Sequence, residues 1–479
     1  MDPHTDFFPP KDKQRFDEEM SGSFVGIGAR LQEKDGTCRV ESIVPGSPCA
    51  KDGRLKKEDV IMKVAQGAEE PVDISGWDLD DIVNIIRGQL NSEVRLTVKH
   101  ADGNMEVISI IRGKVETEAT FAKSGILKIE NMKIGYIVLP EFYADFNNKN
   151  GRRCKVDMQR EIEKLKAEHV NGMIIDLRNN GGGSLDDVVE IGGMFIDQGP
   201  VVQVKSKNAA AEALDDATPG VLYDGPLTIL VNQASASASE ILAAAMQDYK
   251  RGLIIGNTSF GKGTVQRIFP LESFYQGDAS LLPFGSIKLT LQKFYRINGG
   301  STQLKGVTPD IHLPDLYEKM DAGERRDSNS MAWDQIAKAD YKPLKPAVDF
   351  QYLIANSNKR IAANETFRKI EEYASQIKKQ SDDNKSSLNL QKFQQERKEA
   401  KEFSKKLEDL DSNKKTLNFE NLAADMPALK KDTLLNKTNE EWLKRLRKDP
   451  YVAEAGNVIL DWVKALKMNN TGSVINSRN

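Results

Sequence analysis

Cysteine is nearly absent from this chain, which has only Cys38, Cys49 and Cys154 among its 479 residues. Their number is odd, and no two of them stand in the Cys-x-x-Cys spacing that zinc sites and redox centres use. The sequence therefore predicts neither a framework of disulfide bonds nor a cysteine-bound metal, and it leaves the redox compartment open.

Histidine is almost as scarce, since only His4, His100, His169 and His312 are present. Most hydrolases that activate a nucleophile or a metal-bound water need at least one well-placed imidazole. His100 and His169 stand in polar surroundings away from the glycine-rich turns, so we expect the histidines to lie on the solvated surface. A hydrolytic mechanism in this protein would then have to work without histidine.

Long apolar runs and an excess of either charge are missing as well. No stretch approaches the roughly 18 consecutive apolar residues that a membrane span requires, and the N-terminus lacks the pattern of a signal peptide. Lys and Arg number 68 against 71 Asp and Glu, which gives a net charge of -3. A chain without a basic field has little affinity for nucleic acid or an anionic membrane. We expect no nucleic-acid partner, no membrane span and, for the chain as written, neither anchoring nor export.

The length and the changes of pattern along the chain favour a multidomain α/β protein. We expect a polar N-terminal segment at 1–22, a compact domain at 23–113, an α/β core at 114–315 and a charged helical domain at 316–479. The last segment shows no catalytic pattern. A solvated helical appendage is the favoured interpretation, and an interaction surface or substrate clamp is the alternative.

Residues 23–113 alternate short apolar strands with glycine turns around one helix. Leu79, Ile82, Val83 and Ile86 recur at the i, i+3, i+4 and i+7 positions of a helix with one buried face. With the glycine loop at 26–29, this stretch resembles a PDZ domain. Such domains add the last residues of a peptide to a sheet edge, while backbone N–H groups of the glycine loop hold the terminal carboxylate.

The resemblance to a PDZ domain implies a peptide groove between the glycine loop and one helix face. Ordinary core packing and a tight turn are the alternative explanation for the same residues. The candidate groove residues are Phe24, Val25, Gly26, Ile27, Gly28, Ile82, Val83 and Ile86.

Three buried strands in the α/β core, at 172–177, 227–232 and 253–256, each lead into a turn rich in glycine or serine. Ligand chemistry in open α/β sheets gathers at the carboxyl ends of strands. We therefore expect these three turns to form one site.

The turns carry residues suited to acyl transfer. Serine is a poor nucleophile until a base removes its proton, and a lysine can act as that base when burial keeps its amine neutral. Lys262 stands between two glycines, and Gln266 could orient its amine by a hydrogen bond. Ser235, Ser237 and Ser239 all lie in the second turn, and the residues alone do not choose among them.

Acyl transfer also needs hydrogen-bond donors aimed at the developing oxyanion. The backbone N–H of Ala238, next to the middle serine, is one candidate, and that of Gly183 is the other. Gly183 precedes an expected helix, and the partial positive charge of a helix N-terminus suits an anion.

Helix capping is the competing explanation for these turns. Ser237 and Glu240 fit the Ser-x-x-Glu capping box, and Ser184 with Asp187 fits a looser version. A phosphate-binding loop is disfavoured, because the Gly-Lys-Gly-Thr segment at 261–264 lacks the earlier glycine of a P-loop.

Together the motifs resemble the carboxy-terminal processing proteases, specifically their tail-specific type. Such a long series of matched motifs is highly specific. The matching segments are 2–5, 175–183, 235–240, 243–248, 260–266, 291–295, 298–303 and 306–310.

The family resemblance implies a serine endopeptidase with a Ser–Lys dyad on a protease core of the crotonase/ClpP-like type. Ser237 would be the nucleophile, Lys262, at 262 − 237 = 25 residues further on, the general base, and Gln266 its orienter. Gly183 and Ala238 would supply the oxyanion hole. No metal or cofactor is implied.

The resemblance further implies a periplasmic protein that acts on unfolded proteins with apolar C-termini and is switched on when its PDZ domain is occupied. A regulatory adaptor protein is another expected partner. The motif at 2–5 normally stands inside the family's chain, so we expect a form that lacks the family's N-terminal region. The rival hypothesis is a non-catalytic PDZ scaffold or a ligand carrier like the retinoid-binding proteins that share the core fold.

Overall fold

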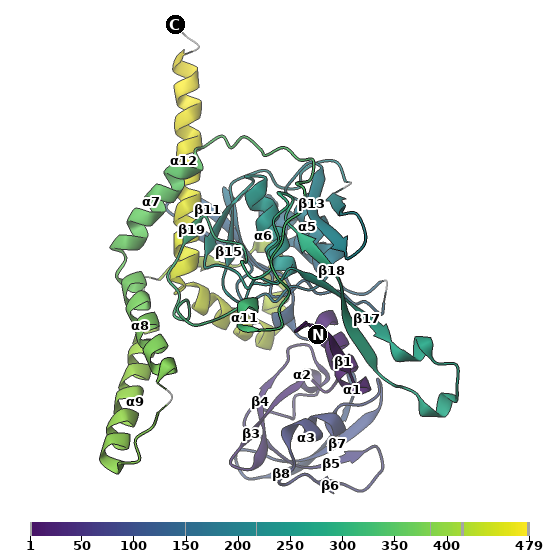
Figure 1. The fold of residues 1–479 in the computed structure, drawn as a ribbon. Helices are drawn as coiled ribbons and strands as arrows, with labels where there is room; N and C mark the ends of the chain where they lie inside the picture. Colours follow the sequence, from purple (N-terminus) through teal and green to yellow (C-terminus); the bar gives the residue numbers. More distant parts are fainter. Residues whose placement is uncertain (1, 149, 217, 384, 413–415, 477–479) are drawn as a thin grey trace. The chain divides into compact units, whose positions relative to one another are not determined.

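Contacts divide the chain into two units, which we describe separately (Figure 1). The first unit comprises Met1–Phe16, Phe121–Met426 and Glu441–Asn479, and the second comprises Asp17–Thr120 and Pro427–Glu440. The computed structural model describes residues 2–148, 150–216, 218–383, 385–412 and 416–476.

The centre of the first unit is a seven-stranded sheet with the order β19-β16-β15-β12-β11-β10-β20. The five strands from β19 to β11 are parallel, so their carboxyl ends share one edge, while β10 and β20 are antiparallel to their neighbours. The strands are β10 (Lys123–Ile129), β11 (Met132–Val138), β12 (Gly172–Asp176), β15 (Leu227–Val231), β16 (Leu253–Gly256), β19 (Ile311–His312) and β20 (Asn418–Glu420).

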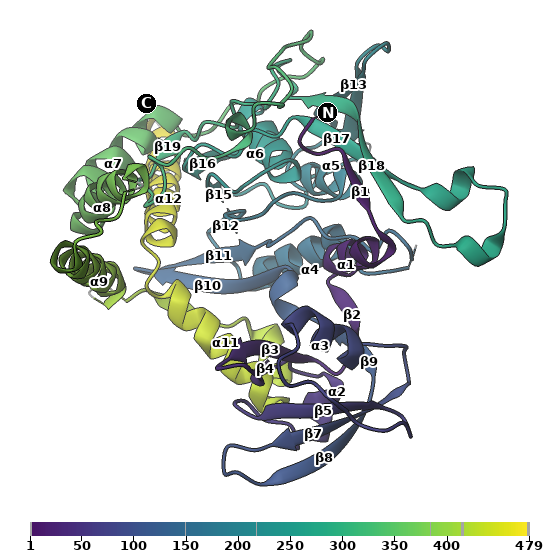
Figure 2. The same ribbon diagram turned by 60° about the horizontal axis from the view of Figure 1, so that its bottom comes forward.

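Successive side chains of a strand point to opposite faces of the sheet, and here both faces are buried because helices cover each of them. Ile175 and Ile229 belong to the core that contains α4, α5 and α6, whereas Ile174 and Leu230 belong to the core that contains α7 and α12. Figure 2 shows these two helix layers on either side of the strands. The helices are α4 (Cys154–Ala167), α5 (Leu185–Gly193), α6 (Ala238–Asp248), α7 (Phe350–Ala363) and α12 (Pro450–Asn476).

A second, antiparallel sheet in the same unit includes the N-terminal segment. Its order is β1-β18-β13-β14, with β17 also paired to β18. The polar segment expected at 1–22 thus forms a strand that pairs Asp6 with Lys288, followed by helix α1 (Pro10–Ser21). The strands are β1 (Asp6–Phe8), β13 (Gly199–Ser206), β14 (Glu212–Asp216), β17 (Thr264–Pro270) and β18 (Ser286–Tyr295).

The C-terminal part of the chain, apart from residues 427–440, belongs to the first unit, and the expectation of a solvated appendage is wrong where its side chains are buried. Phe419 of β20 is buried in the main sheet, and Val458 and Ile459 of α12 are buried against its strands. These apolar residues are diluted by charge in the composition, but the fold gathers them on one face. The remaining helices are α8 (Glu365–Asp382), α9 (Leu390–Ser412), α10 (Met426–Lys431) and α11 (Thr433–Leu446).

The second unit contains an antiparallel sheet with the order β3-β4-β5-β7-β8, in which β6 also pairs with β5, and a separate ribbon of β2 and β9. The helix expected at 79–86 is confirmed as α3, and it buries Ile82 and Ile86 in the core of this unit. The elements are β2 (Ser23–Gly26), β3 (Ala29–Lys34), β4 (Thr37–Ile43), α2 (Pro48–Asp52), β5 (Val60–Gln66), β6 (Val72–Asp73), α3 (Leu79–Ile86), β7 (Glu93–Lys99), β8 (Met105–Ile111) and β9 (Gly113–Glu116).

Candidate active site

Ser237 occupies a strained turn between strand β15 and helix α6. Its backbone has φ 55° and ψ -113°, a combination that non-glycine residues rarely adopt. Such a conformation costs about 1–3 kcal/mol and persists only where the surroundings impose it. A serine on a sharp, strained strand-to-helix turn is the arrangement that exposes a nucleophile in α/β hydrolases.

The three serines of this turn differ in what their hydroxyl groups contact. The Ser235 hydroxyl donates to the carbonyl of Leu177 at 2.8 Å, and the Ser239 hydroxyl donates to that of Asn180 at 2.9 Å. Both side chains are fully buried. Ser237 is partly exposed, and its hydroxyl donates to no other residue that the structure describes. Of the three, Ser237 therefore has the accessible hydroxyl.

Glu240 joins the serine turn to the lysine turn. One oxygen of its buried carboxylate accepts hydrogen bonds from the N–H groups of Ser237 at 2.8 Å and Lys262 at 2.9 Å. The other accepts from the Ser259 hydroxyl at 2.6 Å and the Gly261 N–H at 2.7 Å. Burial raises the pKa of Glu240 to about 7, although the four donors oppose the shift.

The capping explanation is thus correct as far as it goes, since Glu240 does bond the N–H of Ser237 and Ser184 does accept from the N–H of Asp187. It is incomplete, because Glu240 also holds the turn of Lys262. Sequence reasoning missed this second role. The only local signal at Glu240 is the Ser-x-x-Glu spacing, which carries no information about a partner as distant in the chain as Lys262.

Glycines on both sides allow the Lys262 backbone to lie deep in the fold. Gly261 has φ +92°, and a Cβ there would come within 3.1 Å of the Leu304 carbonyl carbon. A Cβ at Gly263 would come within 2.8 Å of the Gln303 nitrogen. Neither position can accept a side chain without displacing backbone, so both glycines are required by packing.

The Lys262 amine lies in surroundings that favour its neutral form. Burial lowers its pKa, and the nearby Lys288 lowers it further, while Glu324 and Glu240 partly oppose the shift. Among the residues that the structure describes, none forms a hydrogen bond or an ion pair with the Lys262 amine. Desolvation without a neutralising partner is what a lysine base requires.

Gln266 does not contact the Lys262 amine as a hydrogen-bond partner. Its amide nitrogen donates to the hydroxyl groups of Thr264 at 2.9 Å and Thr290 at 3.0 Å. Thr290 in turn donates to Asp2 at 2.8 Å. The structure therefore places Gln266 near the lysine turn on strand β17 but shows no direct bond through which it would orient the amine.

Gly183 and Ala238 both present backbone N–H groups that no described residue accepts. Gly183 has φ +133°, and a Cβ there would lie 2.2 Å from the carbonyl oxygen of Phe142, so only glycine fits. The preceding residue, Gly182, lies against the serine turn, since its Cβ would come within 2.7 Å of the Ser237 Cβ. The glycine turn and the serine turn are thus in van der Waals contact.

The candidate groove of the second unit contains both buried and partly exposed residues. Strand β3 forms one edge of the sheet, and α3 packs beside it. Ile27, Ile82 and Ile86 are core residues at no more than 4% exposure. Gly26 and Gly28 are also buried, and Gly28 adopts φ +81°.

Partial exposure within this set is limited to Phe24, Val25 and Val83. These are the side chains that a bound peptide could contact without repacking the core. The N–H groups of Ile27 and Gly28 have no acceptor among the described residues, which leaves them available for a terminal carboxylate.

His169 and His312 are exposed, as expected, whereas His4 and His100 are only partly exposed and contact carboxylates. The His4 ring contacts the buried Glu324 carboxylate at 2.8 Å, and the His100 ring lies 3.0 Å from Asp59 and 3.2 Å from Glu106. Hydrogen bonds to Asp59 and Glu106 raise the pKa of His100. These histidines are engaged with carboxylates, and none of the described contacts joins a histidine to the serine turn.

Neither a metal site nor a membrane segment is found in the described part of the chain. No three His, Cys, Asp or Glu side chains gather there in a way that could hold a metal ion. Among the same residues, each helix is too short or too polar to cross a bilayer.

Comparisons with known proteins cover nearly the whole chain. Residues 133–313 match peptidase family S41, residues 317–464 match the C-terminal domain of tail specific protease (DUF3340), and residues 15–99 match the PDZ domain. The chain is also 34% identical over 465 residues to the tail-specific protease of Haemophilus influenzae, an alignment that covers 92% of this chain. The chain belongs to peptidase family S41. The family and the fold class expected from the sequence are thereby confirmed.

This S41 chain spans 66% of the length of the Haemophilus protease. It is 32% identical over 314 residues to a probable CtpA-like serine protease of Staphylococcus aureus, covering 65% of this chain and 57% of that protein. Two solved structures are also similar to it. One is a photosystem II D1 C-terminal processing protease, at 26% identity and a TM-score of 0.38 over 68% of this chain and 82% of that one. The other is the PDZ domain of a carboxy-terminal protease from Vibrio cholerae in complex with peptide, at 40% identity and a TM-score of 0.19 over 20% and 98%.

Proposed function

We propose that this protein is a serine endopeptidase in which Ser237 is the nucleophile and Lys262 the general base. The observation that carries the proposal is the shared carboxylate of Glu240, which bonds the backbone of both residues. Two segments that are separate in the sequence are thereby held at one place. The accessible hydroxyl of Ser237 and the desolvated amine of Lys262 are the two groups that a Ser–Lys mechanism needs.

The reaction follows from these groups. The neutral Lys262 amine takes the proton from the Ser237 hydroxyl as its oxygen attacks the carbonyl carbon of the scissile peptide bond. The N–H groups of Gly183 and Ala238 donate to the oxygen that becomes negative in the tetrahedral intermediate. The Lys262 ammonium then gives its proton to the leaving amine. Water, deprotonated by the same amine, hydrolyses the acyl-enzyme and regenerates Ser237.

In the proposed site, Gln266 orients the amine of the general base, Lys262. Its amide nitrogen is held by Thr264 and Thr290, which fixes the side chain on β17. Its amide oxygen has no partner among the described residues and is free to accept a hydrogen bond from the Lys262 ammonium once that cation forms. The proposed chemistry uses no metal or cofactor.

The substrates we propose are unfolded proteins with apolar C-terminal residues, bound through the PDZ-like unit. The edge strand β3 can pair with an extended tail, and the N–H groups of Ile27 and Gly28 can hold its carboxylate. Phe24, Val25 and Val83 would contact the last apolar side chain. The resemblance to tail-specific proteases also favours a periplasmic location and an adaptor partner, which cell fractionation and co-purification would test.

Cleavage of an unfolded protein that ends in apolar residues tests the proposal. The unaltered protein should cut it, and Ser237→Ala or Lys262→Ala should each abolish cutting. Cleavage that survives either substitution would refute the mechanism. Amidation of the substrate's C-terminus should slow turnover, because the carboxylate contact is lost. An unchanged rate with the amidated substrate would refute tail recognition and leave the catalytic assignment standing.

A further inference from the structure

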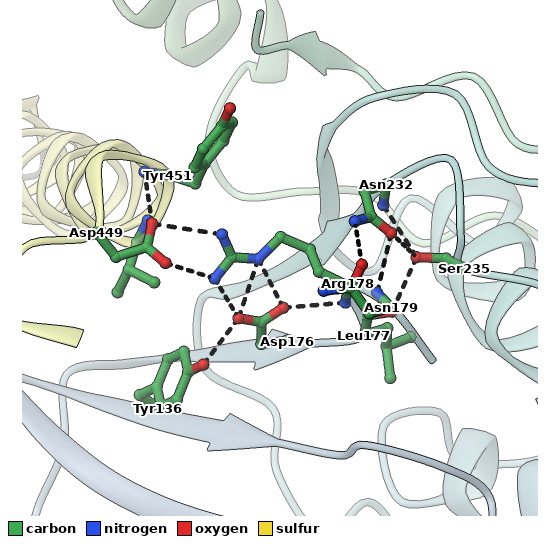
Figure 3. A network of polar contacts seen from close by, with 10 residues as sticks. Tyr136, Asp176, Leu177, Arg178, Asn179, Asn232, Ser235, Asp449 and Tyr451 are labelled. Carbon is green, nitrogen blue, oxygen red and sulfur yellow. Dashed lines mark hydrogen bonds and ion pairs between the residues drawn. The ribbon is translucent and has the colours of Figure 1, made fainter. Parts of the chain in front are cut away.

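Arg178, just after strand β12, is held between two carboxylates (Figure 3). Asp176 belongs to the segment that matches peptidase family S41, and Asp449 to the segment that matches the C-terminal domain. The Arg178 guanidinium bonds Asp176 at 2.5 Å and Asp449 at 2.8 Å, and a second nitrogen bonds Asp449 at 3.3 Å. The Tyr136 hydroxyl donates to Asp176 at 2.7 Å. Burial opposes the charge of Arg178, but the two carboxylates raise its pKa well above the ordinary range. Arg178 is therefore a permanent cation with two fixed partners.

Asp449 has a second task at the start of helix α12. Its carboxylate accepts from the N–H groups of Tyr451 at 2.9 Å and Val452 at 3.1 Å, and so caps the helix. The ring of Tyr451 lies 5.4 Å from the Arg178 guanidinium, and its hydroxyl donates to the Pro314 carbonyl at 2.7 Å. Arg178 is thus contacted by Asp449, which precedes α12, and by Tyr451 of its first turn.

Asn179, the residue after Arg178, is hydrogen-bonded to Asn232, which precedes the serine turn, as Figure 3 also shows. Asn179, at φ +61°, and Asn232 exchange two hydrogen bonds of 2.9 and 2.8 Å. The N–H of Asn232 donates to the Ser235 hydroxyl at 2.9 Å, and that hydroxyl donates to Leu177 at 2.8 Å. The chain before the glycine turn and the chain before Ser237 are therefore bonded side to side.

These contacts lie close to the reacting groups along both segments. Gly183 follows Arg178 by 183 − 178 = 5 residues, and Ser237 follows Asn232 by 237 − 232 = 5 residues. A shift of Arg178 would be passed through Asn179 and Asn232 to both turns. Misplacing reacting groups by about 1 Å can cost a factor of about 100 in rate.

We propose that Asp449 is a positioning residue for catalysis. By fixing Arg178, the C-terminal helical domain holds the turn of Gly183 in its working relation to the turn of Ser237. The catalytic apparatus is therefore incomplete without the segment that follows the matched protease core. This inference rests on the proposed function, and it gives the C-terminal domain a task in the chemical step.

The test is Asp449→Asn in the full chain. Asparagine caps a helix about as well as aspartate, so this change keeps the bonds to α12 and removes the charge that holds Arg178. We expect kcat on an unfolded substrate to fall by about 10- to 100-fold, with KM changed by less than about 3-fold. Labelling by a serine-directed covalent probe should slow by a similar factor.

Asp461→Asn is the matched control. Asp461 lies on the helix that Asp449 caps, bonds Arg360 at 2.5 Å, and is 20% exposed against 19% for Asp449. A purely structural contribution predicts similar losses of thermal stability in both variants and no difference in kcat. We expect the two variants to unfold at similar temperatures, with kcat lowered only by Asp449→Asn.

Combining Asp449→Asn with Arg178→Met tests whether Asp449 acts on catalysis through Arg178. If Asp449 acts through Arg178, the double variant should be no slower than Arg178→Met alone. Equal kcat for Asp449→Asn and Asp461→Asn would overturn the inference, as would fully additive losses in the double variant. Such results, with cleavage that Ser237→Ala still abolishes, would leave the proposed function intact. Cleavage that survives Ser237→Ala would instead overturn the proposed function and this inference with it.

Discussion

Replacement of Glu240 by glutamine tests whether a single carboxylate holds the turns of Ser237 and Lys262 together. The carboxylate now accepts four hydrogen bonds, two of them from the backbone of Ser237 and Lys262. Glutamine has nearly the same shape, but only its oxygen can accept. Whichever way the amide lies, two of the four donors face an NH2 group.

The expected magnitude follows from those two donors. A buried donor without an acceptor costs about 1–3 kcal/mol, so the variant should lose about 2–6 kcal/mol of unfolding free energy at acid pH. If the NH2 faces the N–H groups of Ser237 and Lys262, repulsion would displace one of these residues. If it faces Ser259 and Gly261 instead, a shift of Gly261 would move the adjacent Lys262. A displacement of about 1 Å would lower kcat by about 100-fold.

The pH dependence of this loss has a definite sign. Burial raises the pKa of Glu240 in the fold from 4.5 to about 7. The folded state then holds a proton that the unfolded state has released, so wild-type stability falls as pH rises between these values. At one pKa unit per 1.36 kcal/mol, the loss reaches about 3 kcal/mol above pH 7. Glutamine does not ionise, so the deficit of the variant should shrink by this amount.

The assay combines kcat on an unfolded substrate with urea unfolding at pH 5 and pH 8. Glu161→Gln is the control, because Glu161 is also buried in the first unit and accepts from Ser124 at 2.5 Å and Lys164 at 2.7 Å, away from the serine turn. It should lose stability without losing kcat. If Glu240→Gln retains kcat within about 3-fold while losing stability, Glu240 is only a helix cap and the reasoning fails.

Three further predictions concern the same site. Activity should rise with pH around a Lys262 pKa that lies below its ordinary value, because only the neutral amine accepts the serine proton. If kcat/KM instead rose only near the ordinary lysine pKa of about 10.4, that result would contradict a desolvated amine. The same lowered pKa makes this lysine's contribution to stability grow with pH, since the unfolded state holds the extra proton. Gly182→Ala should abolish cleavage, because its Cβ would lie 2.7 Å from the Ser237 Cβ, whereas Gly181→Ala, with no atom within 4 Å, should retain activity; equal activities would show that the two turns are not in contact. Ser235→Ala should cost about 1–3 kcal/mol for the two hydrogen bonds of its hydroxyl yet still be labelled by a serine-directed probe, while Ser237→Ala should not; the opposite pattern would reassign the nucleophile.

Much of the local structure follows from short-range patterns in the chain. The helix at 79–86 follows from apolar spacing alone. The strands expected at 172–177, 227–232 and 253–256 follow from apolar runs that lead into turns rich in glycine or serine, and they are observed at 172–176, 227–231 and 253–256. Spacing of this kind reports which side chains share a face, and faces decide what becomes buried. The meeting of three turns at one sheet edge follows in turn, because parallel strands end together.

Composition misled where apolar residues are sparse. The segment after residue 316 averages as charged and helical, yet Phe419, Val458 and Ile459 in it are buried. The N-terminal residues read as a polar tail, yet Asp6 to Phe8 form a strand beside β18. A few well-placed apolar side chains, or one pairing of strands, are enough to build a segment into the folded core. The average composition of a long segment does not reveal these features.

The sequence by itself determined that a serine, a lysine and glycine donors stand at the ends of three strands. Tertiary structure decided which of three serines keeps an accessible hydroxyl, because Ser235 and Ser239 give theirs to carbonyls 58 and 59 residues away. It also showed that Gln266 bonds threonines rather than the lysine amine. The ion pair of Arg178 with Asp449 spans 271 residues. Bonds over such separations are absent from any local pattern, since they exist only once the sheet has brought distant turns together.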